Sequence, residues 1–337
     1  MTNKQEGWER WAAILAVTPS VLAIAVFVYG FIGWTVFVSF TKWVTARPDY
    51  TFVGLANYQR ILLGGGIDSQ RFYIDIRNLI GFTVLFLICN IVLGFGLALL
   101  VDSRLRGEHF FQSVYLMPYA VSAIVTGVVW RWLFTPGTQQ LGATGVNKLF
   151  ESIGLGFIHP RWWTDPTVWY IHPDTMLGGF LNDLHLGFFT TANWGLPVAT
   201  FSILIATTWL LSGNVMVLYL AGIRAIPTEL REAAIVDGAT QWQVVRHIYI
   251  PILTPVTLTV VFILLNVAIR LYDLTVAMTG KGPGFSTDTL AFNMFETTFR
   301  SGRFAHGAVL AVVMLIFVSA IVIPYLRYNL RLEETDR

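Results

Sequence analysis

The stretch "NLIGFTVLFLICNIVLGFGLALLV", Asn78–Val101, decides the class of fold, because it contains no Asp, Glu, Lys or Arg. As a helix it would rise about 36 Å, which is enough to cross the roughly 30 Å hydrocarbon core of a bilayer. Strands of a membrane barrel would be about ten residues long and would alternate in polarity, unlike this run. We therefore interpret it as a membrane-spanning helix.

The composition of the whole chain agrees with a membrane protein. Of its 337 residues, 55% are hydrophobic and 15% aromatic, and only 12% are charged, about half the share of a soluble domain. The net charge of +2 gives no reason to expect a nucleic-acid partner. The single cysteine, Cys89, lies inside the apolar run, so it is interpreted as a packing residue. One cysteine excludes an internal disulfide and a metal site built from thiolates.

Five further runs without charged residues occur along the chain, and they extend the prediction to about six transmembrane helices. The first run follows Lys4 and Arg10 as a signal peptide would, but it is too long and lacks a cleavage site, so it is interpreted as an uncleaved span. The sequence therefore predicts an all-α membrane protein with one transmembrane domain over residues 1–337. Its spans are expected near residues 11–40, 78–101, 113–134, 198–223, 256–278 and 304–326.

The distribution of basic residues favours an orientation with both termini in the cytoplasm. Arg104, Arg106, Arg327 and Arg331 lie directly beside spans on the side that this orientation places inside, where the positive-inside rule counts most. Residues 135–197 then form a long outer loop, rich in Trp, Pro, Gly and His. A connection of that length is usually functional or disordered. Its aromatic residues suggest a surface on the membrane interface or against a partner.

The most polar long segment, "IPTELREAAIVDGATQWQVVRHIYIP" at Ile226–Pro251, lies between the fourth and fifth spans on the inner side. Thr228 after Pro227 is a good helix N-cap, and "ELREAAIV" favours helix. Gly238 is suited to a left-handed helix end. The pattern "TQWQ", Thr240–Gln243, predicts a capping box at the start of a second helix, which we expect to run to Tyr249 and to be ended by Pro251. The segment is therefore predicted to be a helix, a glycine turn and a second helix.

This segment resembles the EAA loop of the permease subunits of binding-protein-dependent ABC importers, in the carbohydrate-uptake branch typified by maltose permeases. The family pattern reads roughly Ile-Pro-x-Glu-Leu-x-Glu-Ala-Ala-x-x-Asp-Gly-Ala, with Ile-x-x-Pro later, against "IPTELREAAIVDGA" and "IYIP" here. Other segments also resemble the family: "FVGLANYQRIL" (Phe52–Leu62), "YLMPYAVSAIVTGVVWRWLF" (Tyr115–Phe134), "GVNKLF" (Gly145–Phe150) and "LYDLTVAMTGKGPGFSTDTLAF" (Leu271–Phe292). Residues 167–193 look like an insertion, because the family's outer loop is typically shorter.

The resemblance implies the type I permease fold of ABC importers, in the inner membrane, without a cofactor. In that family the first helix of the EAA loop, here within residues 224–255, sits in a groove of the cytoplasmic ATPase and transmits its closure to the spans. Carried over, the docking residues would be Glu232, Ala233, Ala234, Asp237 and Gly238. The implied partners are a second permease subunit of the same type, a cytoplasmic ATP-binding subunit dimer, a periplasmic or lipid-anchored solute-binding protein, and a sugar as solute.

The chain itself is not expected to be an enzyme. It has no G-x-x-x-x-G-K-[ST] loop, and "TGKGPG" at Thr279–Gly284 lacks a Ser or Thr after its Lys. A stand-alone secondary transporter or channel is the alternative, which would need coupling charges or discontinuous helices at the membrane midplane. A membrane enzyme is a third class, for which we find no acid–base or nucleophile constellation.

Polar residues inside the spans are the candidates for a solute pathway, because burying them in lipid is costly. They are Asn214 in the fourth span and Asn266, Arg270 and Asp273 in the fifth. Arg270 and Asp273 are three residues apart, so on one helix they would share a face and can pair. They would form an internal ion pair, Arg270 would reach for the outer interface, or both would take part in solute passage. The absence of a cationic cluster in the spans favours a neutral solute such as a sugar.

Two further groups of residues are given structural interpretations. Arg131 near the outer end of the third span is expected to extend toward the interface. Several outer-loop residues are metal-ligating types, but their spacing matches no metal motif, so no metal site is predicted: His159, His172, Asp174, Asp183 and His185.

Overall fold

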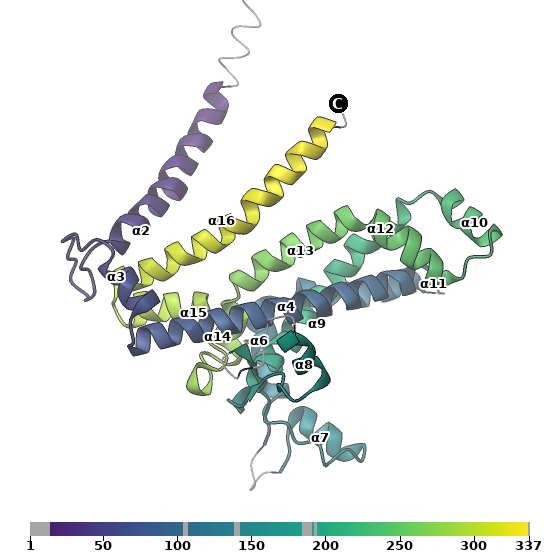
Figure 1. Ribbon diagram of the computed structural model, residues 1–337, viewed down its shortest axis with the longest axis horizontal. Helices are drawn as coiled ribbons and strands as arrows, with labels where there is room; N and C mark the ends of the chain where they lie inside the picture. The colour runs from purple at the N-terminus through teal and green to yellow at the C-terminus, as the bar shows by residue number, and fades with distance from the viewer. Residues whose placement is uncertain (1–13, 104–106, 138–141, 184–190, 192–193, 336–337) are drawn as a thin grey trace, which may run out of the picture. The chain divides into compact units, whose positions relative to one another are not determined.

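The computed structural model describes residues 14–103, 107–137, 142–183, 191 and 194–335 (Figure 1). The start of the first expected span, Arg104, Arg106 and His185 therefore lie outside the described residues. Among the described residues, four helices are long and apolar enough to cross a membrane, namely Ile14–Ser39, Ile67–Asp102, Val198–Arg224 and Phe304–Arg327. Two pairs of helices also pass this test together but are bent at a short break. The chain is an all-α membrane protein, as its apolar runs predict.

The chain divides into two compact units, of which the first contains residues 1–69 and 294–316. Its helix Ile14–Ser39 includes a π-helical segment, η1 (Ala25–Gly30), and α2 (Phe31–Ser39). Asn57 in α3 (Ala56–Tyr58) closes the turn after α2 by donating to the carbonyls of Ser39 at 2.9 Å and Thr41 at 2.8 Å. Further π-helical turns follow at η2 (Gln59–Leu63) and η9 (Glu296–Arg300), and α16 (Phe304–Thr335) begins in this unit.

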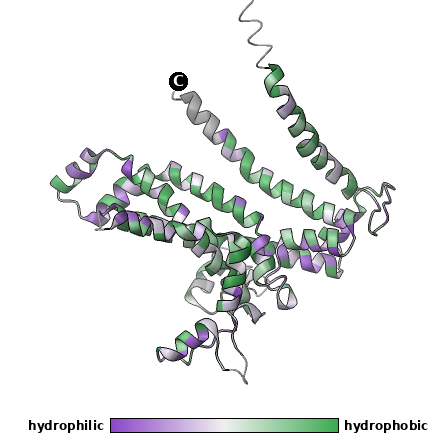
Figure 2. Ribbon diagram, turned by 180° about the vertical axis from the view of Figure 1, so that it is seen from behind, coloured by the Kyte–Doolittle hydropathy of each residue, from purple (hydrophilic) through white to green (hydrophobic). Residues whose placement is uncertain are grey.

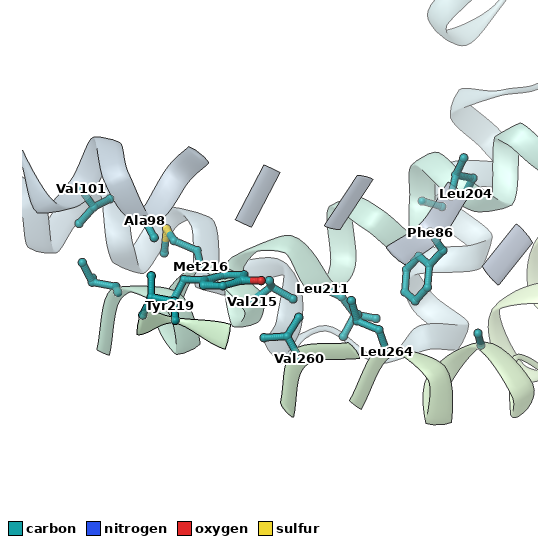
Figure 3. Close-up of a cluster of buried hydrophobic side chains, with 14 of the residues drawn as sticks. Phe86, Ala98, Val101, Leu204, Leu211, Val215, Met216, Tyr219, Val260 and Leu264 are labelled. Atoms are coloured by element: carbon teal, nitrogen blue, oxygen red, sulfur yellow. The ribbon is translucent and has the colours of Figure 1, made fainter. Parts of the chain in front are cut away.

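The second unit, residues 70–293 and 317–337, has its core between three helices. These are α4 (Ile67–Asp102), which begins in the first unit, α9 (Val198–Arg224) and α13 (Thr254–Ile269), and they lie side by side in Figure 1. Figure 3 shows their buried side chains, among them Phe86 from α4, Met216 from α9 and Leu264 from α13. A Cβ at Gly94 of α4 would collide with Val215 of α9, so the glycine permits this close approach.

The third expected span is bent by 97° and is not one straight helix. It consists of α5 (Glu108–Leu116), a 3-10 turn η3 (Met117–Ala120), and α6 (Ala123–Leu133). Pro118 lacks an amide hydrogen, and Val121 after it is extended, with φ −82° and ψ 138°. Ser122 then caps α6 by accepting from the amide of Val125 at 3.3 Å. The apolar run in the sequence predicts the span but not the bend within it.

The fifth expected span, residues 256–278, is broken in the structure. The helix α13 ends at Ile269, and the short helix α14 (Asp273–Met278) follows after Arg270–Tyr272. Helix α14 packs on α6, where a Cβ at Gly127 would lie 2.9 Å from the carbonyl of Leu274. The interpretation of residues 256–278 as one continuous helix is therefore wrong. The chain then continues through η8 (Pro283–Phe285) into α15 (Leu290–Phe295).

The described part of the loop 135–197 contains short elements: α7 (Gly145–Ser152), η4 (Trp162–Thr164), β1 (Val168–Trp169), α8 (Met176–Asp183) and β2 (Leu196–Pro197). Strands β1 and β2 pair antiparallel. Asn147 is buried and accepts from the indole of Trp162 at 2.7 Å. Hydrogen bonds from Thr167 lower the pKa of Asp165, whose carbonyl accepts from the amide of Ala199 at 3.1 Å at the start of α9. This part of the loop is thus fixed to the transmembrane core.

Candidate functional site

The first helix of the segment Ile226–Pro251 is α10 (Thr228–Val236). Pro227 is its N-cap and Thr228 its first residue, with no side-chain cap, so the interpretation of Thr228 as N-cap is wrong. The fixed φ of Pro227, −55°, already gives the chain its entry conformation. At the other end Gly238 has φ +83°. Its amide donates to Ile235 at 3.0 Å and that of Ala239 to Ala234 at 2.9 Å, the two bonds of a Schellman end.

The second helix begins with the predicted capping box. Thr240 accepts from the amide of Gln243 at 3.4 Å, and the side-chain oxygen of Gln243 accepts from the amide of Thr240 at 2.7 Å. The helix runs through α11 (Gln241–Val244), the π-helical η7 (Val245–Tyr249) and α12 (Ile250–Ile252). It therefore passes Pro251, contrary to expectation, and bends by 67° before α13. The wider π turn accommodates the proline, which cannot donate a helical hydrogen bond.

A groove of about 680 Å³ lies where the two helices of this segment meet the end of α4. Its wall from α10 contains Arg231 and Glu232, and Asp102 faces them from α4. The remaining lining residues are Leu99, Ser103, Thr228, Ile235, Gln241, Val245 and Tyr249. Figure 2 shows hydrophilic residues on α10 and α11, in contrast to the mostly hydrophobic α9 and α13. The lining of the groove thus combines charged and apolar side chains.

A second groove of about 460 Å³ adjoins the first and shares Asp102, Thr228, Arg231 and Tyr249 with it. Glu108 and Arg224 form an ion pair in its wall. Thr228 and Arg231 of α10 line both grooves, and most residues of that helix are exposed.

The five residues carried over as docking residues do not all face outward. Glu232 lines the larger groove and is exposed, as are Ala233, Asp237 and Gly238. Ala234 is half-buried and packs against the hydrophobic core of the chain. Its small side chain therefore lets α10 pack closely against the rest of the same chain. The sequence did not single out the exposed apolar side chains nearby, although Val236 is 86% exposed and Trp242 67%.

The candidate solute residues of the fifth span lie around a cavity of about 210 Å³. Asn266, Arg270 and Asp273 all line it, together with Thr207 from α9 and Tyr272. The other lining residues are Ala123, Leu210, Val267, Leu271 and Leu274. One cation, one anion, an amide, a hydroxyl and a phenol are a set of groups that can bind the hydroxyls of a polar neutral solute.

Arg270 and Asp273 do not share a helix face, because the helix breaks between them. Tyr272 has φ −123° and ψ −60°, outside the helical region. Both charged residues are exposed, and within the described chain no ion pair joins them. The expected internal ion pair is therefore absent from this part of the structure. Asn214 is half-buried about two helical turns beyond Thr207 on α9 and is not a lining residue of this cavity.

Other residues singled out in the sequence have local structural partners. His159 lies 3.1 Å from Glu151, and His172 lies beside Tyr170 with ring centroids 4.5 Å apart. The guanidinium of Arg131 lies over the ring of Trp163 at 5.0 Å. Among the residues that the structure describes, no group of three or more His, Cys, Asp or Glu is arranged to hold a metal ion.

Sequence reasoning missed a buried polar cluster at the beginning of α4. Arg71, Asp75 and Asn78 lie on one face of α4 and meet Asp288, which follows η8, and Asn293 of α15. The expected second span began only at Asn78, so its polar neighbours were counted as loop. Their spacing of four and three residues was the signal, because it places all three on the same helix face.

Comparisons with known proteins agree on one class. Residues 90–331 match the family of binding-protein-dependent transport system inner membrane components. A probable ABC transporter permease of Pyrococcus horikoshii is 35% identical over 95% of this chain and 96% of its own length. A xylose/arabinose import permease of Haloferax volcanii is 31% identical over 92% and 85% of the two chains. A trehalose/maltose transport system permease of Thermococcus litoralis is 26% identical over 97% and 96%.

The fold is also found among solved structures. A chain of a bacterial ABC transporter involved in the import of the acidic polysaccharide alginate superposes with a TM-score of 0.72 at 17% identity. The similarity covers 97% of this chain and 98% of that one. A second structure of the bacterial alginate ABC transporter, in complex with a pentasaccharide-bound periplasmic protein, gives a TM-score of 0.69 at 17% identity, over 96% of this chain and 95% of that one.

Proposed function

Because the chain belongs to the family of binding-protein-dependent transport system inner membrane components, we propose that it is the transmembrane subunit of an ABC importer for a carbohydrate. It would work with a second permease of the same type, a cytoplasmic ATP-binding subunit dimer and an extracytoplasmic solute-binding protein. Supporting the sugar as solute, relatives are named for xylose/arabinose and for trehalose/maltose transport. The chain contains no phosphate-binding loop, so ATP hydrolysis would take place on the partner.

The exposed helix α10 is the observation that carries this proposal. It begins after Pro227 and ends in the Schellman end at Gly238, and Ala234 and Ala239 pack it against the core of the chain. The second helix of the segment leads through the 67° bend directly into α13. A push on α10 from a closing ATPase dimer would therefore reach α13 and the break before Asp273. We propose that α10 and its charged groove, with Glu232, Ala233, Asp237 and Gly238, are the docking element.

The variant Glu232→Lys tests the docking role, since it reverses the charge of the groove wall. We expect uptake of the solute to be abolished, while the protein still inserts and can be purified from the membrane. Glu229→Lys is the matched control, because Glu229 is exposed on the same helix but lines neither groove. Co-purification of the ATPase subunit should be lost in Glu232→Lys and retained in Glu229→Lys. Normal uptake by Glu232→Lys would refute the docking role.

The orientation that this function requires places both termini and α10 in the cytoplasm. It is tested by replacing Cys89 with Ala and introducing single cysteines by Asp237→Cys and, in the outer loop, Asp174→Cys. Both carboxylates are exposed, so a membrane-impermeant thiol reagent reaches each position from one side only. We expect labelling of Asp174→Cys in intact cells and labelling of Asp237→Cys only after the membrane is opened. The reverse pattern would exclude an ATPase-coupled role for α10.

The cavity beside Asn266 and Asp273 is proposed as the solute site of this subunit. It is lined by groups from α9, α13 and the break before α14, so any change in their packing alters it. Transport assays with a panel of labelled mono- and oligosaccharides, in cells that lack the native permease, would identify the solute. Uptake of charged or apolar compounds in preference to every sugar would refute the carbohydrate assignment.

A further inference from the structure

The loop of residues 279–289, between α14 and α15, is fastened to the outer part of α4 by buried polar groups. The side-chain amide of Asn78 donates to the carbonyls of Phe285, Ser286 and Asp288 at 3.2, 3.3 and 3.1 Å. Thr200 of α9 donates to Ser286 at 3.0 Å. Asn78 is 3% exposed, so these bonds are shielded from water.

Two carboxyl groups and one guanidinium lie at the centre of this attachment. The Nε of Arg71 donates to Oδ2 of Asp288 at 2.6 Å, and the side chain of Asp288 is fully buried. Asp75, one helical turn after Arg71, has no exposed surface, and its carboxyl group lies close enough to that of Asp288 for the two to interact. Two carboxylates cannot hydrogen-bond each other unless one of them carries a proton, because ionised carboxylates only accept.

Charge balance supports the same arrangement. When all are ionised, Asp75, Asp288 and Arg71 carry one net negative charge in a buried site, which is costly. A single added proton makes the cluster neutral. Of the other cations nearby, Arg77 is two residues from Asp75 and donates to Asn78. Lys281 lies over the ring of Phe285, with its Nζ 5.6 Å from the centroid.

The hydrogen bonds of Asp75 match those of a carboxylic acid better than those of a carboxylate. Its Oδ2 accepts from the side-chain amide of Asn293 at 2.6 Å. Its Oδ1 is buried and accepts from no donor. An ionised oxygen in that position would lose its hydration without replacement, whereas a protonated oxygen needs only an acceptor such as Asp288.

We propose that Asp75 and Asp288 share one proton, and that this buried proton site holds the loop of residues 279–289 against α4. Releasing the proton leaves an uncompensated charge and loosens the loop. The loop is also bonded to the helix break at the solute cavity, since the hydroxyl of Thr289 donates to the carbonyl of Leu271 at 3.0 Å. Alkaline conditions would therefore disturb the cavity lining. The site does not depend on the docking role of α10, which lies at the opposite end of α4, about 40 Å away along the helix.

Infrared spectroscopy of the full-length protein in lipid nanodiscs tests the proton directly. The wild type should show the carbonyl band of a protonated carboxylic acid at neutral pH, and Asp75→Asn should lose that band. Asp174→Asn, which changes an exposed carboxylate of the outer loop, is the matched control and should keep it. A wild-type spectrum without such a band would overturn the proposal, and so would a band that Asp75→Asn retains.

Thermal unfolding as a function of pH gives a second readout. At pH 6 and above, both carboxyl groups are ionised in the unfolded chain, whereas the folded wild type holds one proton. Unfolding therefore releases that proton, and the melting temperature should fall as the pH rises from about 6 to about 9. An Asn side chain at position 75 donates to Asp288 without a proton, so Asp75→Asn should lack this fall. An equal fall in wild type and Asp75→Asn would overturn the proposal. A rise in wild-type melting temperature with Na⁺ at alkaline pH would instead assign the site to a metal cation.

Discussion

Arg224, the last residue of α9, forms an ion pair with Glu108, the first residue of α5. The cation lies at a helix C-terminus and the anion at a helix N-terminus, so each is also favoured by the dipole of its own helix. The pair stands immediately before the proposed docking helix α10 and in the wall of the smaller groove. It therefore connects the bent third span to the segment that would receive the motion of the ATPase.

We predict that either charge reversal in this pair, Glu108→Arg or Arg224→Glu, lowers coupled transport, and that the double exchange restores it. The side chains are 21% and 45% exposed, so the pair should contribute only about 0.2–1 kcal/mol to stability. Its main effect is expected on the position of α10. Uptake rates and ATPase stimulation in the two single variants and the double variant measure this. A double variant as impaired as the singles would show that the pairing itself is unimportant.

Gly238 is predicted to be the residue of the segment Ile226–Pro251 most sensitive to a small substitution. Its φ of +83° is unfavourable for any residue with a Cβ, at a cost of about 1–2 kcal/mol. No atom lies within 4 Å of a Cβ placed there, so Gly238→Ala would act through backbone strain alone. We expect the loss of the Schellman end and a fall in coupled uptake. Gly96→Ala, also without a neighbour within 4 Å but at an ordinary helical φ in α4, should be neutral or slightly stabilising. Equal effects of the two variants would contradict this account.

The glycine turn and the capping box of the segment Ile226–Pro251 were predictable from sequence because their determinants are local. Thr240 and Gln243 are three residues apart, and Gly238 needs only its own backbone angle. The break at Arg270–Tyr272 was not predictable in the same way, since that stretch contains neither Pro nor Gly. It results from packing of α14 on α6 around Gly127. The Asp75–Asp288 contact joins residues far apart in the chain, so no periodicity in one helix could reveal it.

Loss of the capping box is expected to lower the local stability of α11. Thr240→Ala removes the oxygen that accepts from the amide of Gln243, which should cost about 1 kcal/mol and fray α11. Hydrogen exchange of the amides in α11 should become several-fold faster, while exchange in the core of α9 stays unchanged. Thr228→Ala removes a hydroxyl that caps nothing, so exchange in α10 should not change. Equal acceleration by both variants would indicate a general loss of packing and not the loss of a cap.

The helix break between Arg270 and Asp273 leads us to expect that exchanging their two charges impairs transport. The three-residue spacing in the sequence would suggest the opposite. Residues paired on one helix face should tolerate an exchange of charges, whereas residues that separately contact a solute should not. Both line the cavity without an ion pair between them in the described chain.

We therefore expect Arg270→Gln and Asp273→Asn each to raise the KM for solute about tenfold or more, the effect of losing one charged hydrogen bond. The exchange Arg270→Asp with Asp273→Arg should not recover the loss. Arg131→Gln, which removes a cation that lies over Trp163 outside the cavity, should leave KM unchanged. Uptake kinetics with a labelled sugar measure all four variants. Full recovery in the exchanged variant would mean that the two residues pair after all, and that the cavity binds its solute through other groups such as Asn266 and Tyr272.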